Sequence, residues 1–326
     1  MLSRVAHSLY WMSRYSERVE NIARFIDVNM NLILDVPVNF EYQWAPLVKA
    51  TGDHEDFEDR YPQANQRNVI QFLTFDRENP NSIYSAITAA RENARSIREI
   101  ISLEMWEQIN HTYLMIKEAA STNTSLTDPA TLFTDIKKAC HLFIGTTDTT
   151  MTHGEGWHFV RLGRLLERAD KSSRILDVKY FMLLPELDYI GTPFDSLQWT
   201  ALLKSMSASE MYRKSHHRIC PKQIAQFLIL DGNFPRAIHY CLIKAGDSLR
   251  AISESYTDSY SNQAEQRLGR LRSELDYAGI NEIFHQGLHE YLDTFQWNLN
   301  EVGTAIHDTY FEPPAVVAGT PSRYAI

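Results

Sequence analysis

Residues 9–29 read LYWMSRYSERVENIARFIDVN, and this stretch decides the fold. Its apolar residues recur in steps of three and four, the spacing of one face of an α-helix: Trp11, Tyr15, Val19, Ile22 and Ile26. A helix turns by roughly 100° per residue, so its polar residues fall on an adjoining arc of about 120°: Arg14, Glu17, Arg18, Asn21 and Arg24. The stretch therefore predicts a long helix over residues 3–35 with one apolar and one charged face.

Helical spacing continues along most of the chain. Further helices are expected at residues 66–75, 81–120, 131–146, 155–184, 194–213, 221–230, 235–256, 262–277 and 281–311. The acidic segment TGDHEDFEDR at 51–60 is expected to be a solvated loop, and residues 121–131 a polar linker. No run alternates as a half-buried strand would. These patterns predict an all-α fold with a proline-containing, extended tail at 313–326.

Two parts of the sequence recur in the same order. A shift of 150 residues matches charged positions in two helices: Arg14 with Arg164, Glu17 with Glu167, Arg18 with Arg168, Glu20 with Asp170, Arg24 with Arg174, and Asp27 with Asp177. A shift of 155 residues matches a second block: residues 71–73 with 226–228, Asp76 with Asp231, Pro80 with Pro235, and Ile83 with Ile238. Solenoid repeats are shorter, about 20 to 50 residues. We predict a duplicated helical bundle whose halves, 1–150 and 151–312, share one core and are related by a pseudo-twofold axis.

The two aspartates of the second block have a local interpretation. Asp76 and Asp231 each precede a matched proline by four residues. We expect them to accept hydrogen bonds from the turn that begins the next helix rather than to take part in chemistry.

Charged residues are kept between the two matched helices better than apolar ones. Trp11 matches Arg161 and Ile22 matches Ser172, whereas the matched charges keep their signs. Paired arginines one turn apart favour a carboxylate or another anion as partner. The candidate residues are Arg14, Glu17, Arg18, Arg24, Arg161, Arg164, Glu167, Arg168, Lys171 and Arg174. They form either a structural ion network or an anion site.

The charge balance differs between the two helices. Residues 14–27 hold three basic and three acidic side chains, so this set can neutralise itself. Residues 161–177 hold five basic and three acidic side chains, so an anion is expected here if one binds. An open cleft lined by unpaired Arg164, Arg168 and Arg174 would favour a ligand, whereas full pairing of Arg14 and Arg168 with acids of this chain would favour a structural role.

The segment HGEGWH at 153–158 precedes the second charged helix. Gly154 and Gly156 allow a close approach of the backbone, and a helix N-terminus favours an anion. One interpretation is a ligand loop in which His153, Glu155 and His158 act together. The alternative is a glycine-containing turn with a packed Trp157.

Composition excludes several classes of function. The 326 residues carry a formal net charge of −9, which disfavours nonspecific binding to nucleic acid or anionic membranes. The three cysteines are widely spaced and predict neither a disulfide framework nor a zinc site, which favours a reducing, cytoplasmic location. No apolar run is long enough to span a membrane, and the first residues do not read as a signal peptide.

Metal and cofactor motifs are also missing from the sequence. His285 and His289 are four residues apart, but Gln286 stands where an HExxH motif has glutamate. Walker, dinucleotide and nucleophile-elbow signatures are absent. We expect no metal and no cofactor.

The Glu-Arg stretches at 9–29 and 153–181, the two repeated blocks and residues 90–110 (ARENARSIREIISLEMWEQIN) together resemble the bacterial alpha-E family. That family is all-helical and is named for its Glu-Arg motif, here Glu17-Arg18 and Glu167-Arg168. The resemblance runs to about Phe311. The resemblance implies neighbouring proteins but no particular enzymatic activity. Members are encoded beside, or fused to, a circularly permuted ATP-grasp protein, often with a transglutaminase-like peptidase nearby.

The resemblance thus implies an accessory partner of an ATP-grasp amide or peptide ligase, with a Glu-Arg network that could hold an acidic substrate group. The transglutaminase-like peptidase is a second candidate partner. One alternative is an enzyme of the same pathway that binds a carboxylate or phosphate and uses Glu17 or Glu167 in proton transfer. Another is a purely structural interaction module. The sequence leaves the catalytic residues and the oligomeric state open.

Overall fold

The computed structural model describes residues 1–34, 44–122, 128–182, 193–255 and 259–312. Within these ranges every regular element is a helix, which confirms the all-α class. The helices up to residue 150 are α1 (Ser3–Leu34), α2 (Ala45–Thr51), α3 (His54–Arg60), α4 (Gln66–Thr74), α5 (Ile83–Ser96), α6 (Leu103–Thr122) and α8 (Pro129–Thr150). The later ones are α9 (Glu155–Met182), α10 (Pro193–Ser205), α11 (Ser209–Ser215), α12 (Pro221–Leu230), α13 (Ile238–Ser253), α14 (Gln263–Tyr277), α15 (Ile280–Gln286), α16 (Leu288–Ile306) and the π-helix η3 (His307–Phe311). The predicted tail at 313–326 lies outside the described residues.

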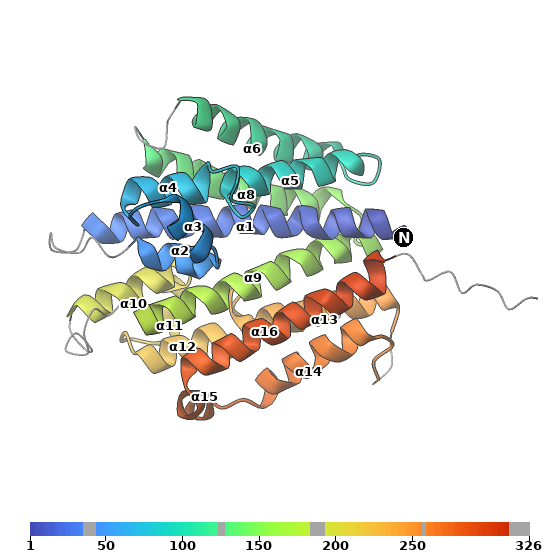
Figure 1. The fold of residues 1–326 in the computed structure, drawn as a ribbon. Coiled ribbons are helices and arrows are strands. Elements are labelled where there is room, and N and C mark those ends of the chain that lie inside the picture. The colour runs from blue at the N-terminus through green and yellow to red at the C-terminus, as the bar shows by residue number, and fades with distance from the viewer. Residues whose placement is uncertain (35–43, 123–127, 183–192, 256–258, 313–326) are drawn as a thin grey trace, which may run out of the picture.

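The two helices with matching charges lie against each other in the middle of the molecule. Figure 1 shows α1 and α9 at the centre, with α4, α5, α6 and α8 on one side and α13, α14 and α16 on the other. Segments about 150 residues apart in the sequence therefore meet along one interface.

One glycine sets the distance between α1 and α9. A Cβ atom added to Gly163 would lie 2.3 Å from the backbone oxygen of Tyr10. Any larger residue at this position would force the two helices apart. The close contact brings the charged faces of both helices within reach of each other's side chains.

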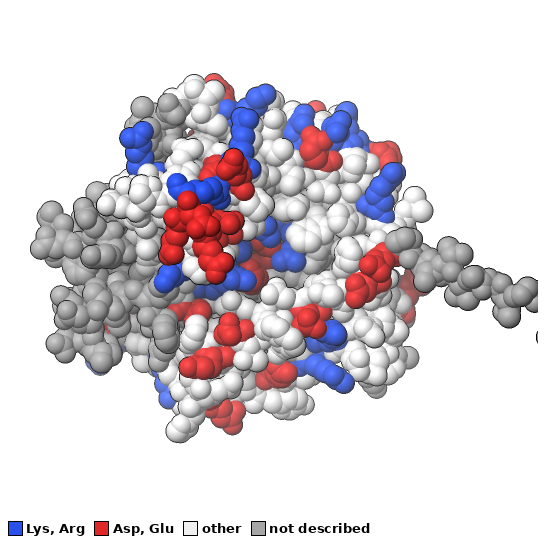
Figure 2. Space-filling view, viewed as in Figure 1, with Lys and Arg blue, Asp and Glu red and all other residues white. Residues whose placement is uncertain are grey.

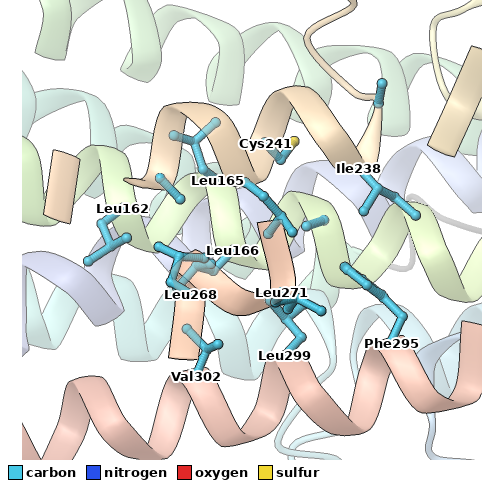
Figure 3. Close-up of a cluster of buried hydrophobic side chains, with 14 of the residues drawn as sticks. Leu162, Leu165, Leu166, Ile238, Cys241, Leu268, Leu271, Phe295, Leu299 and Val302 are labelled. Atoms are coloured by element: carbon cyan, nitrogen blue, oxygen red, sulfur yellow. The ribbon is translucent and has the colours of Figure 1, made fainter. Parts of the chain in front are cut away.

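Apolar side chains form two clusters, and α1 belongs to both. The larger cluster joins Leu9 and Met12 of α1 to α9, α13, α14 and α16. Figure 3 shows part of it, with leucines of α9 packed against residues of α14 and α16: Leu162, Leu165, Leu166, Leu268, Leu271, Phe295, Leu299 and Val302. The smaller cluster joins Val19, Ile22 and Ile26 of α1 to α4, α5 and α8.

Two matching turns lead into α5 and α13. Asp76 Oδ1 accepts a hydrogen bond from the backbone nitrogen of Glu78 at 2.9 Å. Asp231 Oδ1 accepts hydrogen bonds from the backbone nitrogens of Asn233 at 2.8 Å and Phe234 at 2.7 Å. The interpretation of both aspartates as turn-stabilising residues is thus confirmed.

Several helix boundaries differ from those expected. The acidic segment at 51–60 is not a solvated loop, because it contains α3, whose Phe57 is 3 % exposed and stacks on Tyr61. The helix expected at 81–120 is two helices, α5 and α6, joined through the buried Ile97 and Ile101. The segment 194–213 is likewise divided into α10 and α11. The one expected at 281–311 divides at Gly287, whose φ of +102° ends α15 and begins α16.

No helix in the described ranges is both long and apolar enough to cross a membrane.

Candidate functional site

The two Glu-Arg pairs of the sequence bind each other across the α1–α9 interface. Arg168 of α9 donates from Nε and Nη2 to Glu17 Oε1 and Oε2 of α1, at 2.7 and 2.8 Å. Arg18 of α1 donates from Nε and Nη2 to Glu167 Oε1 and Oε2 of α9, at 2.7 and 3.1 Å. Both carboxylates are buried, with side-chain exposures of 1 % and 0 %. Each is therefore held by the two-pronged geometry that guanidinium and carboxylate groups favour.

Further charges surround Glu167. Arg14 donates from Nε to Glu167 Oε2 at 2.9 Å. Asp170 pairs with Arg174 Nε at 2.9 Å and with Lys171 Nζ at 3.0 Å. We call this set the Glu167 network: Arg14, Arg18, Glu167, Asp170, Lys171 and Arg174.

A second set of charged side chains surrounds Glu17 and its neighbour on α1, Glu20. Arg236, from the turn before α13, donates from Nη2 to Glu20 Oε2 at 2.8 Å. Arg24 forms an ion pair with Glu20, and the His141 Nε2 atom lies 3.2 Å from Glu20 Oε1. We call this set the Glu17 network: Glu17, Glu20, Arg24, His141, Arg168 and Arg236.

The glutamates of both networks remain ionised. Burial alone would raise the pKa of Glu167, but the charges of Arg18, Arg14 and Lys171 outweigh burial and hold that pKa well below its ordinary value. Burial is likewise outweighed at Glu17 by Arg168 and Arg236, so the pKa of this carboxyl is also lowered. Neither group has the near-neutral pKa that suits a general acid or base.

The two networks obtain one cation from different places. Lys171 follows Asp170 on α9, and the matching position on α1 is Asn21. Arg236 follows Pro235 in the turn before α13, and the matching position before α5 is Asn81. Arg236 Nη1 donates to Asn21 Oδ1 at 2.9 Å, and Arg18 Nη1 donates to Asn81 Oδ1 at 2.5 Å. The Glu167 network thus has a lysine on the helix, Lys171, and an asparagine in the turn, Asn81. The Glu17 network has the reverse, an asparagine on the helix, Asn21, and an arginine in the turn, Arg236.

The three arginines that would favour a ligand if they lined an open cleft without partners, Arg164, Arg168 and Arg174, have separate surroundings instead. Arg168 is bound to Glu17, and Arg174 is bound to Asp170. Of these three arginines, Arg164 is the one whose Nε atom is buried without a hydrogen-bond partner in the described residues. Burial and the nearby Arg168 lower its pKa. It borders a cavity of about 10 Å³ together with Ser13 and Thr147, enough space for about one water molecule.

The count of charges along each single helix was therefore a poor guide to pairing. It predicted that residues 14–27 neutralise themselves and that residues 161–177 have positive charge to spare. In the structure, each glutamate of a Glu-Arg pair binds arginine from the other helix. The pairing of Arg14 and Arg168 with acids of this chain is the arrangement expected of a structural network.

The residues of the HGEGWH segment have other partners than the networks. His153 stacks on Trp157 with ring centres 4.1 Å apart, and His158 lies edge-on to the same indole at 5.0 Å. Glu155 lies 3.0 Å from the amino nitrogen of Met1. The guanidinium carbon of Arg161 lies 5.3 Å from the centre of the Trp157 ring, and Arg161 Nη1 donates to Ser248 Oγ at 3.4 Å. These contacts form a packed turn at the start of α9, as the alternative interpretation expects.

His289 pairs with Asp177 Nδ1 to Oδ1 at 2.7 Å. In the part of the chain that the structure describes, no three His, Cys, Asp or Glu side chains gather as metal ligands would.

An open cleft borders the Glu167 network, with a volume of about 370 Å³. Its lining comes from α1, α9, α16 and η3: Tyr10, Trp11, Arg14, Leu166, Asp170, Leu299, Asn300, Gly303, Thr304, His307 and Phe311. Figure 2 shows basic and acidic side chains together near the middle of this face, where α9 runs in Figure 1.

Sequence reasoning did not find several residues of the site. Arg236, Asn81 and His141 lie outside the two charged helices, and the cleft wall on α16 lies more than 100 residues from α9 in the sequence. The shift of 155 residues contained a usable signal for two of them, because it matches Asn81 with Arg236 directly after the paired prolines.

The fold and the site define an all-helical protein in which two Glu-Arg pairs bind each other across its central helices. The chain belongs to the Alpha-E family, described as a predicted alpha-helical domain with a conserved ER motif, whose model matches residues 1–311. Similar proteins include an uncharacterised protein of Mycobacterium bovis and two of Mycobacterium tuberculosis strains. Each is 20 % identical over 300 residues, covering 86 % of this chain and 33 % of the relative. The chain thus spans about a third of the length of these relatives. No solved structure matches it.

Proposed function

We propose that this chain is a non-catalytic accessory protein of a circularly permuted ATP-grasp amide or peptide ligase, and that it holds an acidic group of the ligase's substrate. The observation that carries the non-catalytic role is the pairing of Glu17 and Glu167. Each lies buried between α1 and α9 and is bound through both oxygens by arginine from the other helix. The ATP-grasp partner itself is an expectation from the family resemblance.

The lowered pKa values of Glu17 and Glu167 favour this role over the enzymatic alternative. A carboxylate that stays ionised and fully paired exchanges no proton near neutral pH. Buried ion pairs often add little net stability over apolar residues of similar size, and in some proteins they fix one arrangement of the packed elements. The networks would then keep α1 and α9 in one arrangement, so that the cleft beside them keeps its shape.

The lengths of the relatives support a role beside other domains. About two thirds of each mycobacterial relative lies outside the matched region, so the family's region occurs there within longer chains. Three free cysteines fit a reducing cytoplasm, which is where we place the proposed complex. The transglutaminase-like peptidase remains a second candidate partner.

The exchange of partners between α1 and α9 also supports the duplicated bundle with a pseudo-twofold axis. The ion pairs join matching positions that are 150 residues apart in the sequence: Glu17 with Arg168, and Glu167 with Arg18. The turns at Asp76 and Asp231 match as well.

A co-purification experiment tests the proposal. The chain and the neighbouring ATP-grasp protein are expressed together, purified through a tag on the chain, and supplied with ATP and candidate peptides. We expect a stable complex, and mass spectrometry should show an amide-linked product only when both proteins are present. No complex, or equal product from the ATP-grasp protein alone, would overturn the accessory role. A product formed by the chain after removal of the ligase would favour the enzymatic alternative.

A further inference from the structure

The open cleft beside the Glu167 network continues along α16. A second hollow of about 430 Å³ shares Asn300 with it and is bordered by Arg174, Asp293 and Trp297. The Trp297 side chain is 64 % exposed. The two hollows thus meet at Asn300, and we call them together the groove. The first hollow alone is large enough for a small ligand.

Arg14 supplies a guanidinium group to this groove. Its Nε donates to Glu167 Oε2 at 2.9 Å, and its Nη1 donates to the Tyr10 hydroxyl at 3.1 Å. Among the described residues, Nη2 has no such acceptor, and the side chain is 17 % exposed. The Glu167 network holds four cations, Arg14, Arg18, Lys171 and Arg174, against the two carboxylates of Glu167 and Asp170. One further negative group at Arg14 is therefore favourable.

Aromatic rings stand next to this guanidinium group. The Trp11 ring lies 5.1 Å from the Arg14 guanidinium carbon. The Tyr10 ring lies 5.7 Å from Trp11 and 5.3 Å from Phe311. Phe311 and His307 belong to η3, and single π-helical turns are rare and occur frequently at functional sites. A ligand that reaches Arg14 thus has an apolar wall beside its charged group.

The matching position on α9 offers no such space. Arg164 corresponds to Arg14, yet the cavity beside it holds about 10 Å³ rather than about 370 Å³. Two acids, Asp170 and Asp293, also border the groove. They repel a multiply charged anion such as phosphate more strongly than a single carboxylate.

We propose that the groove binds a carboxylate with an aromatic or aliphatic group beside it, as in the C-terminal residue of a peptide. The carboxylate lies at Arg14, and the apolar group packs on Trp11 and Phe311. This deepens the proposed function by naming the substrate class, and it rests on that function for the biological source of the ligand.

Two matched probes test the carboxylate. The purified chain is titrated, without any ligase, with N-acetyl-L-phenylalanine and with its C-terminal amide, and binding is followed by calorimetry or NMR. We expect the acid to bind at least tenfold more tightly than the amide and more tightly than inorganic phosphate. Equal affinity for acid and amide, tighter binding of phosphate, or no binding would overturn the proposal.

A glycine in the groove provides a filling variant. Gly303 of α16 borders the cleft, and a Cβ atom added there meets no heavy atom within 4 Å. We expect Gly303→Phe to abolish binding of the acid. The matched control is Gly246→Phe on α13, because Gly246 is also helical, half-buried and free of neighbours within 4 Å but does not border the groove.

One further measurement and one reserve variant keep the test independent of folding. Thermal unfolding checks that both phenylalanine variants fold, and Thr304→Trp, at an exposed position of the same cleft, replaces Gly303→Phe if that variant does not. Unchanged affinity in a folded filling variant would place the ligand elsewhere and overturn the proposal. Because the titration contains only this chain, its failure is distinguishable from failure to bind the ligase.

Discussion

Glu167 is the carboxylate on which most cations of its network converge. Arg14 and Arg18 bind it directly, and Lys171 Nζ lies 3.9 Å away. Removing the negative charge would leave Arg14 and Arg18 close together without their shared carboxylate, and Asp170 would be the one acid left in the Glu167 network. The cost of such a change is larger than the net contribution of the intact pair, because the remaining guanidinium groups are largely buried, with side-chain exposures of 17 % at Arg14 and 13 % at Arg18.

We expect Glu167→Gln to lower the free energy of unfolding by about 3 to 5 kcal/mol, since it breaks a buried ion pair from one side. Urea unfolding at neutral pH measures this. Glu155→Gln, at an exposed position, serves as the control and should change stability by about 0.5 kcal/mol or less. An unchanged unfolding midpoint in Glu167→Gln would show that the network contributes no structural support.

The pH dependence of stability should report the same carboxylates. Burial opposes ionisation of Glu17, Glu20 and Glu167, but the neighbouring arginines hold each pKa below its ordinary value of 4.5. The unfolded chain therefore takes up more protons than the folded chain below about pH 4.5. The stabilisation is fully present above that pH and is lost as the pH falls through the pKa values of the folded state.

Urea unfolding at pH 7, 5, 4 and 3 should thus show a free energy of unfolding that decreases steeply below pH 4.5. The Glu167→Gln variant lacks one of the titrating groups and should show a shallower decrease. Parallel pH profiles for the two proteins would contradict the assignment of a lowered pKa to Glu167.

At the scale of single residues, the sequence predicted which side chains belong together but not how they pair. The shift of 150 residues identified the arginines and glutamates of both networks. It could not show that Glu17 binds Arg168 and Glu167 binds Arg18, because that exchange depends on how two distant helices lie against each other. For the same reason, Arg236 was missed, although it supplies a cation to Glu20.

At the scale of helices, the α1–α9 contact depends on a residue without a side chain. Gly163 is buried against the backbone of Tyr10, and its neighbours cannot move without moving all of α1. The same contact sets the ion-pair distances, which tolerate little displacement.

Gly163→Ala should lower the free energy of unfolding by about 1 to 3 kcal/mol, the usual cost of overpacking a core. Gly145→Ala on α8 is the control, since a Cβ atom there meets nothing within 4 Å and alanine is a better helix former. We expect the control to be neutral or slightly stabilising by urea unfolding. A neutral Gly163→Ala variant would mean that the contact of Gly163 with Tyr10 does not limit how closely α1 and α9 pack.

Helix periodicity was sufficient to find most helices but not their breaks. Apolar residues at 83, 87, 90, 94, 97 and 101 keep helical spacing, yet the chain turns between α5 and α6. Burial of Ile97 and Ile101 against other helices stabilises that turn, and neither proline nor glycine marks it. Periodicity also missed α3. Phe57 is the buried residue of this acidic helix, and its ring packs against Phe72 of α4.

At the scale of the whole molecule, α1 is shared between both clusters of apolar side chains. Leu9 and Met12 belong to the larger cluster with α9 and the later helices, and Val19, Ile22 and Ile26 belong to the smaller cluster with α4, α5 and α8. The groove on α16 was beyond sequence reasoning for a related reason, since its walls come from both ends of the chain.

Separate fragments 1–150 and 151–312 should therefore not unfold cooperatively when studied alone, because each lacks apolar and charged partners from the other. Mixing them at equal concentration should restore helical circular dichroism and a cooperative thermal transition. Fragment 151–312 unfolding alone with the midpoint of the intact chain would contradict this expectation.

The different sources of one cation in the two networks have an evolutionary consequence. Lys171 on a helix and Arg236 in a turn supply a comparable positive charge to neighbouring acids. We expect that a lineage can lose Lys171 if Asn81, which matches Arg236, mutates to a basic residue, or lose Arg236 if Asn21, which matches Lys171, does so. Single columns of an alignment should then show these four positions as variable, and the expectation is that the sum of charge at each acidic pair stays constant.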